Sequence, residues 1–253
     1  MSLSSYLELP GFLPFYPLFV GGALLLAYLC GAIPMALIIG RLTSGVDIRE
    51  HGSGNTGTTN AFRVLGWGPG LLVFAGDVLK GSLGCLIMHL TLAKMGSILL
   101  ESTDLLIDKT LDGATAAHAV AVAGPLHDIP LALALLVCIV GHMFSVFMKF
   151  KGGKGIATSF GALLVVMPFV ALSGLAVFLL FTFVSRIASV GSITAALSLP
   201  ITAFIFHGDS VSYIVFTFIA AFIMIIAHRK NVVRIFQGKE PRFSIANSKE
   251  NID

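Results

Sequence analysis

The stretch IATSFGALLVVMPFVALSGLAVFLLFTFV, residues 156–184, decides the fold of this chain. It contains no charged side chain, and it is longer than the about 20 residues with which an α-helix crosses a bilayer. Pro168 lies near its middle, and proline interrupts a helix because its ring nitrogen carries no hydrogen. The stretch therefore predicts two short helices inside a membrane, about 156–167 and 169–184.

The composition of the whole chain extends this prediction. Of 253 residues, 56% are hydrophobic and only 11% are charged, and the mean hydropathy is +0.94, whereas about a quarter of the residues of a soluble domain are charged. Further apolar runs cover about 12–39, 71–100, 129–147, 190–206 and 211–227. A transmembrane barrel would show shorter segments of alternating polarity. The sequence therefore predicts an all-α integral membrane protein.

The charged residues between the apolar runs predict how the chain is oriented. Lys and Arg gather on the cytoplasmic side of membrane proteins. The basic clusters of this chain are Arg41 with Arg49, residues 149–154, and residues 229–242, whereas residues 101–128 are acidic. We therefore expect the basic clusters in the cytoplasm and the acidic segment outside.

The number of crossings depends on the stretch around Pro168. Three single crossings after Lys154 would leave the basic C-terminal residues outside, whereas two short helices return the chain to the cytoplasmic level. We therefore expect seven transmembrane segments, including short or half-length helices, with the N-terminus outside and the C-terminus cytoplasmic.

We expect these segments to form a single domain over residues 1–253. It carries an outer insertion at about 96–128 and a polar cytoplasmic tail at about 229–253. Within the insertion, residues 114–123 are expected to form either an interfacial helix or a mobile loop.

A stretch of small and polar residues, HGSGNTGTTNAFR at 51–63, lies between two apolar runs. Its glycines can expose successive backbone N–H groups, its hydroxyl and amide side chains donate further hydrogen bonds, and Arg63 adds a fork of donors for an oxyanion. This combination predicts a loop that binds a phosphate. The alternative is a flexible cytoplasmic connector, since Gly-rich loops are also ordinary linkers.

A second polar loop, KFKGGKG at residues 149–155, leads directly into an apolar helix. Lysine beside glycines at a helix start can place positive charge and N–H groups around an anion. The loop is not a Walker A nucleotide-binding loop, which needs Ser or Thr after the lysine where this chain has Gly155. Orientation in the membrane is the alternative role for its lysines, and it explains Lys154 less well because that lysine stands between glycines.

Two shorter polar segments follow, RIASVGS at 186–192 and HRKNVVR at 228–234. On a helix, His228, Asn231 and Arg234 lie three positions apart and share a face. Taken alone, the segment at 186–192 is typical of a short loop and the segment at 228–234 of a basic anchor at the membrane surface.

Ionisable residues also lie inside the apolar runs, among them Asp77, Lys80 and His142. Asp77 and Lys80 are three positions apart, and mutual neutralisation is the simple explanation for such a pair at membrane depth. We expect this pair to position a helix without touching substrate. His142, in GHMFSVF, is typical of a packed or interfacial histidine when it is taken alone.

Together these segments resemble the PlsY family of membrane acyl-phosphate:glycerol-3-phosphate acyltransferases. The motifs that carry the resemblance follow the family's order: SGNTGTTN at 53–60 with Arg63, DVLKG at 77–81, GHMFSVF at 141–147, FKGGKGIAT at 150–158, RIASVGS at 186–192, and His228-Arg229 with Asn231. The resemblance covers about residues 20–240. It implies an enzyme of the bacterial inner membrane, with its site facing the cytoplasm. This enzyme transfers a fatty acyl group from acyl phosphate to the 1-hydroxyl of sn-glycerol 3-phosphate.

The resemblance also implies the site residues and the partners. The partners are acyl phosphate, glycerol 3-phosphate and membrane lipid, with no cofactor, metal or nucleic acid. The implied phosphate- and substrate-binding residues are Ser53, Gly54, Asn55, Gly57, Thr59, Arg63, Gly153 and Lys154. The implied catalytic residues are Lys154, Ser189, His228 and Asn231.

Two motifs that activate other acyltransferases and hydrolases are absent from the sequence. No histidine is followed by an aspartate at the fifth position, and there is no Gly-x-Ser-x-Gly nucleophile motif. We therefore expect direct transfer without an acyl-enzyme, with a substrate phosphate or His228 accepting the hydroxyl proton. The competing class is a membrane transporter of phosphate-bearing small molecules, for which paired half-helices are also natural.

Overall fold

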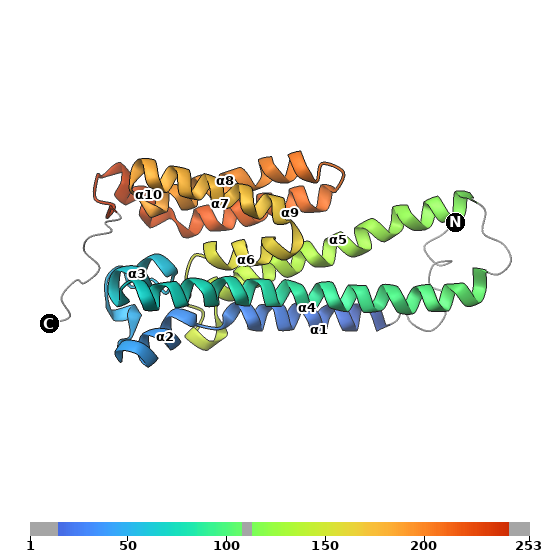
Figure 1. Ribbon diagram of the computed structural model, residues 1–253, viewed down its shortest axis with the longest axis horizontal. Coiled ribbons are helices and arrows are strands. Elements are labelled where there is room, and N and C mark those ends of the chain that lie inside the picture. Colours follow the sequence, from blue (N-terminus) through green and yellow to red (C-terminus); the bar gives the residue numbers. More distant parts are fainter. Residues whose placement is uncertain (1–14, 108–112, 243–253) are drawn as a thin grey trace.

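The computed structural model describes residues 15–107 and 113–242, with the side chains of those outside 97–126 (Figure 1). Every regular element in these ranges is a helix, which confirms the all-α prediction. The helices are α1 (Tyr16–Ala32), α2 (Met35–Ser44), η3 (Ile48–Glu50), α3 (Thr58–Leu65), α4 (Trp67–Ile107), α5 (Gly113–Met143), η4 (Val146–Met148), α6 (Ile156–Val166), α7 (Pro168–Ser185), α8 (Ala188–Phe206), α9 (Val211–Ala227) and α10 (Arg229–Phe236).

Several of the helices have the length and polarity of membrane spans. Within the described ranges, five helical segments are long and apolar enough to cross a bilayer, and there are six if α9 and α10, bent by 57°, count as one span. α6 is apolar but shorter. Many large apolar side chains face outward, such as Phe183 of α7, which is 85% exposed. Such side chains suit a surface that lies in lipid rather than in water.

The break predicted at Pro168 is confirmed. α6 ends at Val166 and α7 begins at Pro168, with Met167 between them in a non-helical conformation (φ −143°, ψ 73°). Proline is tolerated at the first position of a helix, where its missing N–H would have no partner in any case.

A second break, at Pro34, was not predicted. The apolar run 12–39, expected to form one helix, is divided there into α1 and α2, because proline lacks the N–H donor and its ring clashes with the preceding turn. Side chains from other helices complete the break. Lys80 Nζ donates to the carbonyl oxygen of Ile33 (2.8 Å), and Ser145 Oγ donates to the carbonyl one residue earlier (2.5 Å).

The sequence predicted a loop over the whole of the first polar segment, residues 51–63, but only its first half is a loop. Its second half forms α3, which follows an extended Gly57 (φ −96°, ψ 164°), so Thr59 and Arg63 are helical residues. Ala61 lies on the inner face of this helix and is fully buried. Burial of an apolar face explains why a helix forms in so polar a stretch.

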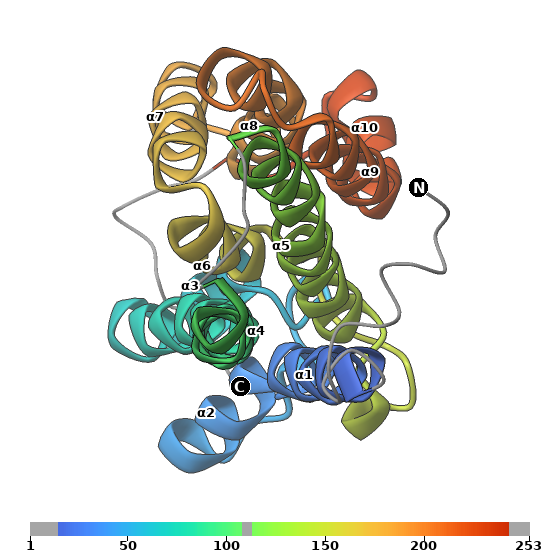
Figure 2. The same cartoon turned by 90° about the vertical axis from the view of Figure 1, so that its right-hand side faces the viewer.

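Figures 1 and 2 show the helices in two groups, with α7 to α10 on one side of α5 and α6 and with α1 to α4 on the other. α4 and α6 approach each other closely at Gly81 and Gly161. A Cβ on Gly81 would lie 2.1 Å from the carbonyl oxygen of Thr158, and a Cβ on Gly161 would lie 1.9 Å from that of Val78. Small residues allow such close contact between membrane helices. The contact fixes α6, and with it the loop at 149–155.

α4 and α5 extend beyond the other helices at the end of the molecule opposite α3 and α10 (Figure 1). The predicted outer insertion, about 96–128, falls on these two helix ends and on residues 108–112, which are outside the described residues. Residues 114–123 belong to α5. The predicted polar tail begins as helix α10, and its residues 243–253 lie outside the described part.

Candidate active site

Hydrogen bonds join the polar segments at 149–155, 186–192 and 228–234, and the charge of Arg63 places the segment at 51–63 near them. Lys154, in the second segment, donates a hydrogen bond to Oδ1 of Asn231, in the fourth (2.5 Å). Ser189, in the third segment, and Asn231 both donate to Glu240. Arg63, in the first segment, lies near enough to Lys154 to act on its charge. Segments far apart in the sequence therefore form one cationic cluster.

The cluster places the amine of Lys154 in an unusual environment. Burial lowers its pKa from 10.5 to about 8; the cations Arg234 and Arg63 act in the same direction, and the carboxylate of Glu240 opposes them. A nearby anion favours the charged form of a buried amine. Lys154 is therefore poised to gain from the arrival of a negatively charged ligand.

Glu240 stands at the centre of the cluster and was not predicted. Its Oε1 accepts hydrogen bonds from Ser189 Oγ (2.7 Å) and Asn231 Nδ2 (2.6 Å), and its Oε2 pairs with Arg234 Nε (2.7 Å). Its side chain is only 7% exposed. Burial alone would raise the pKa of Glu240, but the hydrogen bonds from Arg234, Ser189 and Asn231 outweigh it and lower the pKa. The carboxylate is therefore ionised at neutral pH.

Asn231 links Lys154 to Glu240 through the two ends of its amide. Its oxygen accepts from the amine and its nitrogen donates to the carboxylate, so the two contacts fix the orientation of the amide. A lysine amine has three hydrogens. Lys154 can therefore hold Asn231 and a ligand oxygen at the same time.

His228 lies buried at the junction of α9 and α10. Its Nδ1 is 2.8 Å from the carbonyl oxygen of Met224, and because a carbonyl oxygen can only accept, Nδ1 carries the hydrogen. In the neutral ring, Nε2 is then the basic nitrogen. Lys154 is close enough to His228 to act on it electrostatically. This arrangement is consistent with a base at His228.

The first polar segment is organised by Asn60, which the sequence analysis did not single out. The side chain is buried. Its Oδ1 accepts from the N–H of Ser53 (2.9 Å), and its Nδ2 donates to the carbonyl oxygens of His51 (3.2 Å) and Ile48 (3.4 Å). An asparagine at the end of a Gly-rich loop was the only sequence signal for this role.

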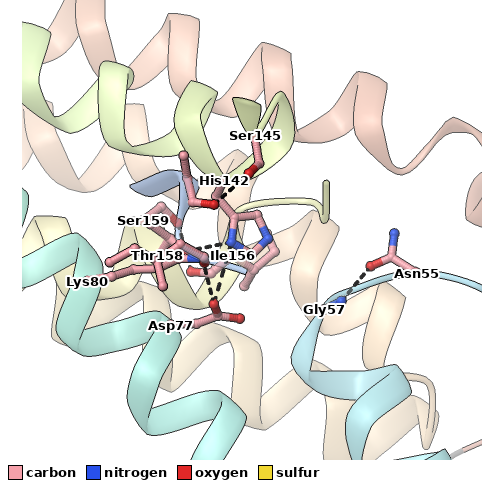
Figure 3. Close-up of polar contacts among 11 residues, drawn as sticks. Asn55, Gly57, Asp77, Lys80, His142, Ser145, Ile156, Thr158 and Ser159 are labelled. Carbon is pink, nitrogen blue, oxygen red and sulfur yellow. Dashed lines mark hydrogen bonds and ion pairs between the residues drawn. The ribbon is translucent and has the colours of Figure 1, made fainter. Parts of the chain in front are cut away.

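The N–H groups of the glycines expected to bind phosphate make hydrogen bonds within the protein, and their contact with a phosphate stays a prediction. The N–H of Gly54 donates to the carbonyl oxygen of His51 (3.0 Å), and the N–H of Gly57 donates to Oδ1 of Asn55 (2.9 Å; Figure 3). The N–H of Gly153, in the second segment, is likewise engaged in a backbone hydrogen bond. The N–H groups of Gly54 and Gly57 point into their own turns, and that of Gly153 donates to the carbonyl oxygen of His142 at the end of α5. In this structure the glycines therefore shape the loops.

The side chains of the first segment differ in how near they come to the cluster. Ser53 and Thr59 are exposed, and among the contacts of the described residues no hydrogen bond joins either of them to Lys154. Asn55 uses its oxygen within the loop, which leaves its amide nitrogen for a ligand. Arg63 is the member of this segment whose charge reaches Lys154.

The apolar helical bundle has the fold of a membrane-integral acyltransferase, and it carries a cationic, amide-lined cluster at one of its ends. The chain belongs to the glycerol-3-phosphate acyltransferase family, whose family model matches residues 22–238. The resemblance found in the sequence is thereby confirmed.

Relatives and solved structures agree with this assignment. The glycerol-3-phosphate acyltransferase of Bacillus subtilis (strain 168) is 38% identical, over 87% of this chain and 95% of the relative. That of Chlorobium phaeobacteroides (strain BS1) is 37% identical, over 87% of this chain and 94% of the relative. The crystal structure of PlsY, an integral membrane glycerol 3-phosphate acyltransferase, in its glycerol 3-phosphate form matches with a TM-score of 0.70 and 33% identity, over 89% of this chain and 96% of that one.

Proposed function

We propose that this protein transfers a fatty acyl group from acyl phosphate to the 1-hydroxyl of sn-glycerol 3-phosphate. The products are 1-acylglycerol 3-phosphate and inorganic phosphate, in the first acylation of phospholipid synthesis. The observation that carries the proposal is the chain of contacts from Lys154 through Asn231 to Glu240. It holds a half-buried amine ready for the phosphate group that both substrates carry. The glycerol 3-phosphate form of the related PlsY structure supports the choice of acceptor.

Two phosphate groups need two sets of donors. Lys154 and Arg63 supply positive charge, which gives shorter and stronger hydrogen bonds to phosphate oxygens than neutral donors do. The neutral donors of the first segment are Ser53, Asn55 and Thr59. Those proposed for the glycerol phosphate pocket are Ser189, His228 and Asn231. Gly54, Gly57 and Gly153 shape the loops that carry these side chains.

In the proposed reaction the 1-hydroxyl oxygen attacks the acyl carbonyl carbon. The bond between that carbon and the phosphate oxygen breaks, and phosphate leaves. The hydroxyl proton passes to Nε2 of His228 or to a phosphate oxygen of a bound substrate. Acyl phosphate is a mixed anhydride with a good leaving group. Holding two anions in attack geometry and stabilising the developing charge can therefore supply much of the acceleration, with no acyl-enzyme.

The proposal includes a place in the cell. The single domain of residues 1–253 would cross a bacterial inner membrane as seven segments, with α6 and α7 as two short helices, and its insertion at 96–128 would lie outside. The N-terminus would be outside and the C-terminus and the site in the cytoplasm. In support, α2, α3 and α10, near which basic residues gather, lie at one end of the bundle (Figure 1). Tags that locate both termini on one side of the membrane would contradict this topology.

Purified protein supplied with labelled glycerol 3-phosphate tests the reaction. With acyl phosphate as the donor we expect a labelled lipid product, and parallel reactions with acyl-CoA and with acyl-carrier protein test the choice of donor. A transporter of phosphate-bearing molecules would instead carry glycerol 3-phosphate into vesicles and form no lipid. Absence of product with acyl phosphate, together with such uptake, would overturn the proposal.

A further inference from the structure

A buried ionic cluster lies inside the membrane helices (Figure 3). Asp77 and Lys80 of α4 form the ion pair predicted from their spacing, with Oδ1 and Nζ 2.8 Å apart. Nδ1 of His142, on α5, lies 3.6 Å from the same oxygen of Asp77 and 3.0 Å from Oγ1 of Thr158, on α6. All four side chains are buried. Three helices therefore meet at one polar centre.

The proposed reaction does not use this centre directly. Among the contacts of the described residues, no hydrogen bond or ion pair joins it to Lys154 or to Glu240. Ionisable groups at membrane depth are costly and commonly serve a site. These side chains are therefore expected to act by holding other parts of the protein in place.

His142 connects the centre to the loop that carries Lys154. Its carbonyl oxygen accepts the N–H of Gly153 (3.2 Å), and the carbonyl oxygen of Met143 accepts that of Gly152 (2.9 Å). The ring also lies against the loop, since a Cβ on Gly153 would be only 2.2 Å from His142 Nε2. Gly153 immediately precedes Lys154, so the ring of His142 constrains the position of the backbone at the lysine.

We propose that Asp77, His142 and Thr158 are positioning residues of this acyltransferase. By fixing the ring of His142, the carboxylate and the hydroxyl hold the turn at Gly152 and Gly153, and with it the amine of Lys154, in reach of a substrate phosphate. This inference rests on the proposed role of Lys154. Apolar side chains would serve packing equally well, whereas a fixed orientation of the ring needs polar partners.

Two substitutions at Thr158 separate positioning from packing. Thr158→Val keeps the volume and removes the hydroxyl that meets His142, whereas Thr158→Ser keeps the hydroxyl and removes a methyl group. In the full chain purified in detergent, we expect Thr158→Val to raise the KM for glycerol 3-phosphate about tenfold, the size of one lost buried hydrogen bond. We expect kcat to change less and Thr158→Ser to stay within about twofold. If Thr158 served packing alone, Thr158→Ser would be the more damaging change, because loss of the methyl group leaves a cavity that Thr158→Val does not leave.

A second readout needs no catalytic activity. The rate at which an amine-reactive reagent modifies Lys154, followed by mass spectrometry, should rise several-fold in Thr158→Val and not in Thr158→Ser. Ser82→Ala is the matched control. It removes another hydrogen bond to α6, from Ser82 Oγ of α4 to the carbonyl oxygen of Gly161 (2.8 Å), and should change neither KM nor labelling.

An unchanged KM with unchanged labelling in Thr158→Val overturns the inference. If the wild-type protein forms no acylglycerol phosphate, the proposed function fails instead, and the labelling rates still decide whether the polar centre holds Lys154. If Thr158→Val does not fold, Thr158→Ala takes its place with the same expectations. It differs from Thr158→Ser only in the hydroxyl and leaves the ion pair of Asp77 and Lys80 intact.

Discussion

The amine of Lys154 and the amide oxygen of Asn231 are joined by a hydrogen bond of 2.5 Å, although 77 positions separate the two residues in the chain. The bond ties the loop before α6 to helix α10, and Glu240 continues the connection from Asn231 to Ser189 at the start of α8. The cluster therefore forms only when three separate parts of the second half of the chain have packed together.

Removal of the amine should damage binding of the phosphate. We expect Lys154→Ala to lower kcat/KM about 100-fold, because a charge-assisted bond to phosphate is lost and Asn231 loses its donor. Steady-state kinetics on the purified protein measure this. The control is Lys151→Ala in the same loop, whose side chain is exposed and whose loss should change the rate by no more than about twofold. A folded Lys154→Ala protein with full activity would remove Lys154 from the site.

The pKa of Lys154 predicts an alkaline limb in the pH profile. Because the pKa is lowered to about 8, the free enzyme loses this charge as the pH rises through about 8, and kcat/KM should fall there. The stability of the folded protein should change in the opposite direction. Burial of the charged amine costs free energy below pH 8, and this cost is relieved between pH about 8 and 10.5, so the contribution of Lys154 to the unfolding free energy rises with pH in that window. A flat kcat/KM between pH 7 and 9 would contradict this assignment.

The charge of Glu240 should set the pH at which kcat/KM begins to fall on the alkaline side. We expect Glu240→Gln to lower the pKa of Lys154 below about 8, because the carboxylate favours the protonated amine. The decline of kcat/KM then begins at a lower pH than in the wild type. Glu50→Gln, which changes an exposed acidic residue, is the control and should leave the profile unchanged. An alkaline limb that does not move in Glu240→Gln would separate the carboxylate from the site.

Glu240 also predicts an effect of acid on stability. Its pKa is lowered in the folded protein, so its stabilising contribution is present above the usual value of 4.5 and is lost as the pH falls through the folded pKa. Thermal unfolding of the wild type and Glu240→Gln should therefore converge at low pH and differ at pH 7. Equal differences at both pH values would show that the carboxylate acts through its shape rather than its charge.

His228 is expected to accept the hydroxyl proton through Nε2. On that basis His228→Ala should lower kcat about 100-fold or more, which is the usual contribution of a general base, with a smaller change in KM. Measurement of kcat and KM separately checks this. Near-normal turnover would transfer the role to a substrate phosphate, and the kcat profile should then show an ionisation near the second pKa of phosphate, about 6.

The close contact between α4 and α6 predicts a stability difference between two glycines of the same helix. Gly81→Ala would place a Cβ 2.1 Å from the carbonyl oxygen of Thr158, and we expect it to destabilise the protein by about 3 kcal/mol. Among the described residues, no atom lies within 4 Å of a Cβ added at Gly96, so Gly96→Ala should be neutral or stabilising by up to about 1 kcal/mol. Thermal unfolding in detergent compares the two variants, and equal midpoints would contradict the contact.

The sequence predicted those parts of the fold where composition and charge left few alternatives. The break at Pro168 was predicted because an uninterrupted helix would have put the basic C-terminal residues on the wrong side of the membrane. The break at Pro34 was missed because nothing in the order of charges depended on it. A proline in a membrane helix can produce a modest kink or a full break, and the outcome depends on whether other helices supply donors. Here Lys80 and Ser145 do so.

The sequence grouped several polar residues that the structure brings together, but it did not predict their contacts. Lys154, Ser189 and Asn231 were expected together, and they meet through Glu240, a residue whose only sequence signal was its acidity in a basic tail. The hydrogen bonds of Gly54 could not be foreseen, since a glycine-rich loop can turn its N–H groups outward to a ligand or inward to itself. That choice depends on local backbone geometry, which composition does not reveal.

The bend at Pro34 also bears on how the chain is assembled. The two carbonyl groups that precede it, those of Ile33 and Ala32, accept hydrogen bonds from Lys80 of α4 and from Ser145, just after α5. Both donors leave the ribosome after α1 has already been made. The first helix and the turn that follows it can therefore reach their final hydrogen bonding only once residue 145 has been synthesised and α5 has joined α1 in the bilayer. A nascent chain arrested before that point would hold α1 without the partner that sets the direction of α2.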